Sequence, residues 1–343
     1  MKENWRNKKV LVTGVTGFVG GNLVAKLHNS GATIFGLSRN ENPFCYLNQE
    51  GYNDKIQLIN GDLSDHQFLY NTITELQIEV VYHLAAQVEI GVGLSNPFLT
   101  FETNVRGTYN LMEACRMSKM GGHNIQAIIV ASSDKAYGAY PVEKMPYQET
   151  YPLLPQFPYD TSKACADLIC KSYAIDQYSL PIVITRFSNI YGRGQMNFSA
   201  IVPDSIRSGL EFSTFVPRSD GSMVRDFIYA EDVADLYMRI ALGIIEEPDR
   251  LRGHIFNAGS NSPINMRTLI TKIYNQLGNH NGLQIILDQM KGKTTTGEIS
   301  HQHMSFEKVF EFFGWQPEHN MDLGLKKTIS WFQEFFEKNT LSK

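Results

Sequence analysis

Short apolar runs alternate with helical patterns of hydrophobic positions along the first half of the chain. Strands followed by crossover helices in this order predict a parallel sheet with helices on its faces. The expected strands are Val10–Thr13, Thr33–Leu37, Ile56–Ile59, Val80–Leu84, Ala127–Ala131 and Ile182–Arg186. The expected helices lie near 19–30, 66–76, 98–117 and 159–176.

The pattern changes after about residue 187, where Pro and Gly interrupt the chain more often. This change predicts a smaller, loop-rich lobe laid over the sheet edge. We expect one domain over 1–187, to which 226–259 returns, and a second lobe over 188–225 and 260–343. Its segments include helices near 202–209, 231–243, 264–277 and 322–338, and the polar segment 290–304 is expected to form a mobile loop.

Composition is that of an ordinary globular enzyme, with 43% hydrophobic and 19% charged residues. The formal charge of −4, without a basic run, does not favour a nucleic-acid partner. No apolar stretch approaches the roughly 18 residues of a membrane span, and the N-terminus lacks the apolar core of a signal peptide. Four cysteines without C-x-x-C spacing predict reduced thiols in a cytoplasmic protein, and no metal site is expected.

A glycine-rich turn follows the first expected strand. Gly14, Gly17 and Gly20 stand between that strand and a helix, which is the order required for a dinucleotide site. The helix N-terminus would offer unpaired amides to the phosphates. The sequence therefore predicts an α/β fold with a Rossmann-type, doubly wound parallel sheet and a smaller, loop-rich C-terminal substrate lobe.

Two later segments carry candidate redox chemistry. Ser132–Gly138 supplies hydroxyl, carboxylate and amine groups, and Tyr159 and Lys163 are four residues apart on one expected helix. This spacing puts the phenol and the ammonium on one helix face. A nearby cation lowers the pKa of a phenol, ordinarily about 10, by about 1 to 3 units. We therefore expect Lys163, helped by a cationic nicotinamide ring, to make Tyr159 a general base.

These motifs, together with His83-Leu84-Ala85-Ala86, Arg186-Phe187-Ser188-Asn189 and Arg225-Asp226-Phe227-Ile228-Tyr229, resemble those of the extended short-chain dehydrogenase/reductases. The likeness covers essentially the whole chain and implies a nucleotide-sugar epimerase or dehydratase. The Asp134-Lys135 pair after Ser133 resembles CDP-glucose 4,6-dehydratases and the inverting UDP-N-acetylglucosamine 4,6-dehydratases. The interval to Tyr159 and the sequence Ala85-Ala86-Gln87 favour the first group.

A 4,6-dehydratase of an NDP-hexose is the expected function, with Asp134 and Lys135 as acid and base for loss of water across C5 and C6. Lys135 serves as a base only when neutral; the alternative is that it orients Asp134 through a salt bridge. Gly194-Gln195-Met196 departs from the Gly-Asp-Trp element of CDP-glucose dehydratases. An epimerase or reductase of the same superfamily, or a cofactor-binding protein without catalysis, are the other readings.

The resemblance implies a complete set of site residues. The expected catalytic residues are Ser133, Asp134, Lys135, Tyr159 and Lys163. The expected cofactor-binding residues are Gly14, Thr16, Gly17, Phe18, Val19, Gly20, Ser38, Arg39, Asp62, Leu63, Leu84, Ala85, Ala86, Asn104, Tyr159 and Lys163. The expected substrate-binding residues are Gln87, Ser133, Asn189, Arg218 and Arg225.

The cofactor and the assembly also follow from these positions. Enzymes selective for NAD usually end the second strand with an acid, whereas Ser38-Arg39-Asn40 stands here. NADP, bound tightly and recycled, is therefore favoured over NAD. In the family, helices near 98–117 and 159–176 pair with their copies, so a homodimer is expected through positions such as Val105, Leu111, Ala164, Leu168 and Ile169. From the sequence alone, these positions could equally pack only against the sheet. Nucleic acid and membrane are not expected partners.

Overall fold

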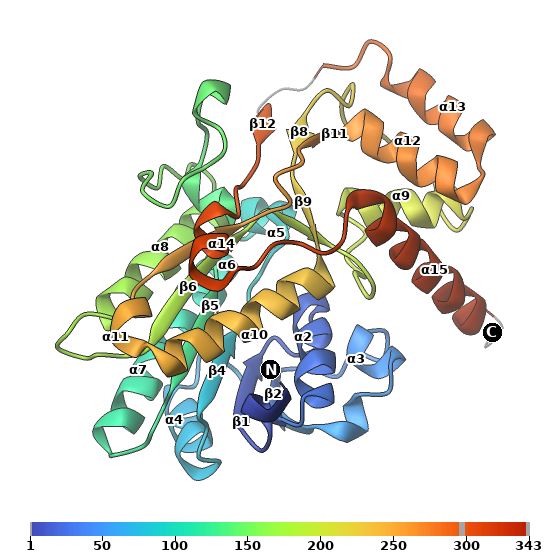
Figure 1. Ribbon diagram of the computed structural model, residues 1–343. Helices are drawn as coiled ribbons and strands as arrows, with labels where there is room; N and C mark the ends of the chain where they lie inside the picture. Colours follow the sequence, from blue (N-terminus) through green and yellow to red (C-terminus); the bar gives the residue numbers. More distant parts are fainter. Residues whose placement is uncertain (1, 295–298, 341–343) are drawn as a thin grey trace.

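The computed structural model describes residues 2–294 and 299–340 (Figure 1). Its centre is a seven-stranded parallel sheet in the order β10-β6-β5-β4-β1-β2-β3. The strands are β1 (Lys9–Thr13), β2 (Thr33–Ser38), β3 (Gln57–Asn60), β4 (Val80–His83), β5 (Ala127–Ala131), β6 (Ile182–Phe187) and β10 (Ile255–Ala258). The six strands expected from the sequence are present within a residue or so at each end, and the doubly wound fold is confirmed.

Helices cover both faces of this sheet. One layer contains α4 (His66–Glu75), α7 (Gly107–Met120) and α8 (Pro158–Tyr173), which pack in that order. The opposite layer contains α2 (Phe18–Asn29) against α10 (Ala230–Glu246). Each helix layer forms its own apolar core with the strand side chains that point to its face of the sheet. Burial of β1, β4 and β5 on both faces explains why their sequences read as continuous apolar runs.

The helix expected over 98–117 is divided. It consists of α6 (Pro97–Phe101), one π-helical turn over Glu102–Arg106 and α7. Asn104, in the π-helical turn, is buried, and its side chain is bonded to both backbone groups of Gln87. Single π-helical turns inside α-helices occur frequently at functional sites, because they redirect one side chain.

Much of the chain after β6 forms a second group of elements at the carboxyl edge of the sheet (Figure 1). Its helices α9 (Ile201–Gly209), α12 (Met266–Leu277) and α15 (Met321–Thr340) share one apolar core with α13 (His280–Met290), which the sequence pattern did not predict. Three short strands, β11 (Ile264–Asn265), β8 (Val224–Arg225) and β12 (His301–Gln302), form a small sheet. Strands β7 (Asn189–Tyr191) and β9 (Phe227–Tyr229) pair with each other.

The remaining short elements connect these layers. They are α1 (Lys2–Trp5), α3 (Tyr46–Gln49), α5 (Ile90–Ser95), α11 (Pro248–Leu251), α14 (Glu307–Phe313) and the 3-10 turns at Asn53–Lys55, Asp134–Tyr137 and Val142–Lys144. Segment 226–259 contributes α10 and β10 to the layers of the first domain. Part of the loop expected at 290–304, residues 295–298, lies outside the described residues. No helix in the described ranges is long and apolar enough to cross a membrane.

Candidate active site

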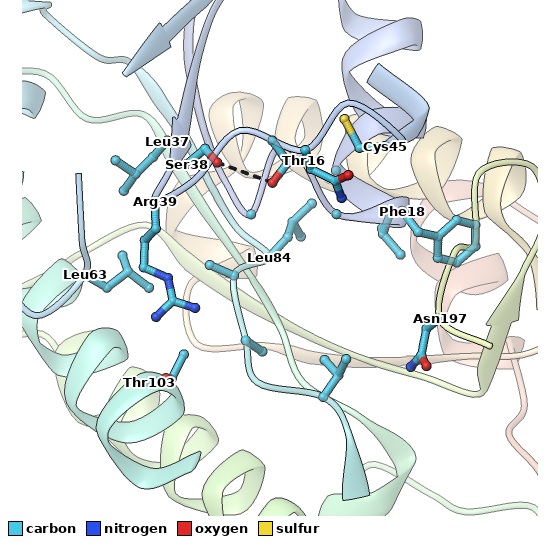
Figure 2. A pocket seen from close by; sticks show the side chains of 18 of the residues that line it. Thr16, Phe18, Leu37, Ser38, Arg39, Cys45, Leu63, Leu84, Thr103 and Asn197 are labelled. Atoms are coloured by element: carbon cyan, nitrogen blue, oxygen red, sulfur yellow. Dashed lines mark hydrogen bonds between the residues drawn. The ribbon is translucent and has the colours of Figure 1, made fainter. Parts of the chain in front are cut away.

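A cavity of about 780 Å³ lies at the carboxyl ends of β1, β2 and β4 (Figure 2). Its size and position at the edge of a parallel sheet suit a dinucleotide. Thirteen of the sixteen residues expected to bind a cofactor line it: Gly14, Thr16, Gly17, Phe18, Val19, Gly20, Ser38, Arg39, Asp62, Leu63, Leu84, Ala85 and Ala86. Asn104, Tyr159 and Lys163 lie outside this lining.

The turn between β1 and α2 requires its glycines. Gly14 has a φ of +71°, and a Cβ atom there would lie 2.7 Å from the backbone nitrogen of Ala85. A Cβ on Gly20 would lie 2.4 Å from the Gly14 carbonyl oxygen. Gly17 precedes α2 without a side-chain cap, and the residues of the first helical turn, Phe18, Val19 and Gly20, line the cavity. The turn therefore fits a dinucleotide pyrophosphate.

Ser38 and Arg39 lie at the end of β2, on the rim of the same cavity. Figure 2 shows the Arg39 side chain extending into the cavity from this end. The Arg39 guanidinium lies 3.6 Å from the Asp62 carboxylate, and both side chains are about half exposed. Partial burial acts to raise the pKa of Asp62, but hydrogen bonds from Ser64 and the Arg39 charge hold it below its ordinary value. Ser38 Oγ donates to the Asn40 carbonyl oxygen at 2.7 Å.

The predicted catalytic residues come from two elements that pack together. Ser133 follows β5 and precedes the 3-10 turn at Asp134–Tyr137, and this turn packs on α8. Ser133 Oγ donates to Asp134 Oδ1 at 3.0 Å, and Asp134 is buried. The Ser133 side chain also lies near the Tyr159 phenol and acts to lower its pKa. The structure therefore brings Ser133, Asp134 and Tyr159 together.

That Lys163, helped by a cationic nicotinamide ring, lowers the pKa of Tyr159 stays a prediction, because it includes the charge of the cofactor. Burial is the largest effect and raises the pKa of Tyr159 above its ordinary value, and the Ser133 side chain offsets only part of this. Lys163 is buried too, and burial lowers its pKa to about 8. Its Nζ donates to the Ala131 carbonyl oxygen at 2.8 Å. Among the effects of the protein's own groups, desolvation is thus the largest on the pKa of both Tyr159 and Lys163.

Lys135 is held by a residue that the sequence did not predict. Its Nζ donates to Oε1 of Gln302 at 2.6 Å, and Gln302 belongs to β12, far along the chain. Asp160, next to Tyr159, is a second residue that was missed. Burial raises the pKa of Asp160 to about 6, Lys135 lowers it and Asp134 raises it, so all three charges share one region. The position of Asp160 inside the Tyr-x-x-x-Lys segment was the available signal.

Three polar residues close to the candidate catalytic residues, His83, Asn104 and Gln87, form hydrogen bonds with other protein groups. His83 lies between Thr13 and Thr108, 3.0 Å from each hydroxyl, and burial lowers the pKa of His83 to about 3. The structural hydrogen bonding that its place at the end of a strand suggests is thus present. Asn104 Nδ2 donates to Ser162 Oγ at 2.8 Å and so ties the Gln87 loop to α8. The Gln87 amide itself bonds to Thr100 and to the Glu89 carbonyl.

A second cavity of about 590 Å³ lies in the C-terminal lobe. Three predicted substrate residues, Asn189, Arg218 and Arg225, line it. Arg225 is buried, and its Nη1 donates to the Val224 carbonyl oxygen at 2.8 Å. Gln195 lines both cavities, so the two spaces share a wall.

The comparisons with known proteins identify the family and the shared fold. The sequence model described as the NAD dependent epimerase/dehydratase family matches residues 10–259. The chain is 27% identical over 336 residues to a dTDP-D-glucose 4,6-dehydratase of Homo sapiens, covering 96% of this chain and 91% of that protein. It is 28% identical over 326 residues to a putative UDP-glucose 4-epimerase of Methanocaldococcus jannaschii, covering 94% and 98%.

Among solved structures, a dTDP-glucose 4,6-dehydratase of Bacillus anthracis in complex with NAD superimposes with a TM-score of 0.79 at 25% identity. The match covers 96% of this chain and 98% of that one. A dTDP-glucose 4,6-dehydratase of Streptomyces venezuelae, solved with NAD, gives a TM-score of 0.82 at 23% identity over 96% and 98%, which shows the shared fold.

Proposed function

This chain belongs to the NAD dependent epimerase/dehydratase family, and within it we propose that it is a nucleotide-sugar 4,6-dehydratase. The proposed reaction converts an NDP-hexose to an NDP-4-keto-6-deoxyhexose. The observation that carries this proposal is the buried Asp134 carboxylate, bonded to Ser133 in the same turn as Lys135. Hydride transfer at a hydroxyl carbon needs the Ser133, Tyr159 and Lys163 set, whereas loss of water needs a further acid and base.

The first step is oxidation at C4 of the sugar. Tyr159 takes the proton of the C4 hydroxyl, and Ser133, whose side chain acts to lower the pKa of the phenol, orients that hydroxyl. When bound, the nicotinamide supplies the hydride acceptor for C4 and later the donor for C6, and its positive charge favours the ionised phenol. Lys163, fixed by the Ala131 carbonyl, holds a second positive charge at the helix face that carries Tyr159.

Loss of water follows, because a 4-keto group acidifies the C5 proton. Lys135 takes this proton, and the electron pair of the C–H bond forms the C5–C6 double bond as the C6–O bond breaks. Asp134 gives a proton to the departing hydroxyl, which leaves as water. C6 then receives the hydride that left C4, and C5 regains a proton, which leaves a 4-keto-6-deoxy sugar.

The substrate proposal rests on the second cavity and on sequence likeness. Arg225 and Arg218 both line that cavity. The paired N–H donors of an arginine guanidinium match the spacing of phosphate oxygens, so they suit a diphosphate. Asn189 and Gln87 are the further proposed substrate contacts. The resemblance of Asp134-Lys135 and Ala85-Ala86-Gln87 to CDP-glucose dehydratases supports a CDP-glucose-like substrate. Ser38 and Arg39 at the rim of the first cavity support NADP over NAD.

An epimerase is the second candidate, supported by the similarity to the Methanocaldococcus jannaschii protein. Both candidates use the same first oxidation, and they differ in whether water is lost. Incubation of the protein with CDP-, UDP-, GDP- and dTDP-hexoses, with NAD or NADP, followed by mass spectrometry separates them. Loss of the mass of one water supports the dehydratase, and an isomer of unchanged mass supports the epimerase. A Tyr159→Phe variant, which lacks the phenol, is the control for either activity.

A further inference from the structure

Gln302 joins the proposed base to a distant part of the chain. The residue is fully buried on β12, its Oε1 accepts the 2.6 Å hydrogen bond from Lys135 Nζ, and its Nε2 donates to the Tyr147 hydroxyl at 3.2 Å. Tyr147 in turn donates to the Gly138 carbonyl oxygen at 2.6 Å. Because both ends of the amide are engaged, its orientation is fixed and its oxygen faces the lysine.

The strand that carries Gln302 is also the neighbour of the proposed diphosphate site. In the parallel pairing of β12 with β8, Gln302 stands opposite Arg225. Arg225 lines the second cavity and Lys135 belongs to the turn after Ser133. Gln302 therefore connects the element that would hold the substrate's diphosphate to the amine that would act on its sugar.

The groups around an amine bias its charge, and Lys135 is partly buried with the Asp134 and Asp160 carboxylates in the same region. A carboxylate within about 4 to 6 Å favours the ammonium form and typically shifts a pKa by about 1 to 3 units. A neutral amide oxygen accepts an N–H from an ammonium or from an amine, and so holds the nitrogen without requiring its charge. A neutral lysine keeps its lone pair, which a proton acceptor needs.

We propose that Gln302 is a positioning residue, whose amide holds Lys135 Nζ toward the sugar while leaving the amine able to take the C5 proton. This inference rests on the proposed dehydratase function and deepens it. Other charged groups face the same region. Asp134 lies on the same turn as Lys135, and the Asp160 carboxylate lies on α8. The titratable Tyr147 phenol contacts the Gln302 amide, and Arg225 lies on the adjoining strand β8.

The test uses two variants of the full-length protein. Gln302→Glu keeps the shape and supplies a carboxylate, and Gln302→Met keeps the approximate volume and removes the acceptor. Three quantities are measured between pH 6 and 10: reduced cofactor formed in a single turnover, water loss from the substrate, and labelling of Lys135 by an amine-reactive reagent, read by peptide mass spectrometry. The exposed Gln276→Glu variant on α12 is the matched control.

For Gln302→Glu we expect C4 oxidation within about twofold of the wild type, and water loss reduced at least about tenfold at neutral pH but recovering as the pH rises. The labelling midpoint should move up by about one pH unit or more, because a carboxylate favours the ammonium. Gln302→Met should lose water more slowly at every pH, label faster and keep its Michaelis constant. Equal losses in both variants at all pH values, with an unmoved labelling midpoint, would overturn the inference.

The two proposals fail separately. If the wild type loses water from no nucleotide sugar, the dehydratase is wrong, while the labelling midpoints of wild type and Gln302→Glu still test the contact. If Gln302→Glu does not fold, the labelling and water-loss measurements on Gln302→Met alone test the inference. Unchanged labelling and unchanged water loss in that variant would show that Lys135 does not depend on Gln302.

Discussion

Ser133 Oγ donates a hydrogen bond of 3.0 Å to Asp134 Oδ1. The Ser133 side chain also acts to lower the pKa of the Tyr159 phenol, so one hydroxyl lies beside the residues assigned to deprotonation at the C4 hydroxyl and to protonation of the leaving C6 hydroxyl. Oxidation at C4 and loss of water at C5 and C6 would then use side chains whose positions are fixed relative to one another. These positions are fixed because Asp134 is buried and its turn packs on α8.

Asp134→Asn is expected to stop the reaction after its first step. An amide keeps the size of the side chain but has no proton of suitable acidity for the leaving hydroxyl. We expect loss of water to fall by about 100-fold or more, in the range typical for general acid catalysis. Reduced cofactor should still form in a single turnover. If this variant makes keto-deoxy product at a near-normal rate, Asp134 is not the acid.

The sheet and the glycine turn could be predicted because their signals are local. A strand buried on both faces reads as an apolar run, and Gly14 occupies a position that a side chain would block. The strand β10 could not be found from its own four residues, although its return to the first domain was expected. Strands β8, β11 and β12 have two residues each, which is too short to show a period.

The contacts of the site were less predictable, because burial and long-range pairing decide them. Lys135 and Gln302 are 167 residues apart, and neither segment carries a sequence signal that predicts their contact. The pKa of Tyr159 follows desolvation rather than the spacing to Lys163. Of the positions expected at a dimer surface, Leu111 and Ala164 are buried inside the subunit, and Leu111 belongs to the apolar core between this helix layer and the sheet.

Arg225→Ala is expected to raise the Michaelis constant of the nucleotide sugar by roughly tenfold or more, because a charge-assisted hydrogen bond is worth about 1.5 to 3 kcal/mol. The rate at saturation should change less. Arg218→Ala, in the same cavity, is the companion variant and should have the weaker effect. Steady-state kinetics across both variants provides the measurement, and a Michaelis constant unaltered in Arg225→Ala removes that residue from the diphosphate site.

Asp160→Asn is expected to stabilise the protein at neutral pH. Burial raises the pKa of Asp160 from 3.8 to about 6, so the folded state holds this proton more tightly than the unfolded state. The stabilisation from Asp160 is therefore complete below about pH 3.8 and is lost as the pH rises through 6. Asparagine resembles the protonated acid, so the gain should be near zero at pH 4 and about 1 to 3 kcal/mol above pH 7.

Denaturant unfolding of the wild type and Asp160→Asn at several pH values measures this difference. The exposed Asp288 serves as the control, because a hydrogen bond from Lys291 lowers its pKa and Asp288→Asn should give no gain at neutral pH. A stability difference between Asp160→Asn and the wild type that does not change from pH 4 to 8 would contradict the assigned pKa.

Leu168→Glu is expected to convert a proposed homodimer to a monomer. Leu168 on α8 is 62% exposed and Met117 on α7 is 36% exposed, so these neighbouring helices present apolar side chains outward. A buried carboxylate on such an interface would be repelled by its own copy. Light scattering at micromolar concentration measures the mass, with Ile285→Glu on α13 as the control for a general effect of surface charge. A wild type that is monomeric under these conditions disproves the dimer.

The last prediction concerns the cofactor that the protein retains. Ser38 and Arg39 stand where an acid would bind the ribose 2′-hydroxyl, and Arg39 lies 3.6 Å from Asp62 across the rim of the cavity. A 2′-phosphate would compete with Asp62 for this guanidinium and would gain a planar, always charged partner. Denaturing the purified protein and identifying the released dinucleotide should therefore yield mainly NADP. Arg39→Ala should weaken NADP binding by about tenfold or more while changing NAD binding little, because a charge-assisted bond is worth about 1.5 to 3 kcal/mol. Isothermal titration of both dinucleotides with wild type and variant measures this. Release of NAD alone, together with equal affinities in Arg39→Ala, would show that the rim binds the adenosine of NAD and that Asp62 keeps Arg39 engaged.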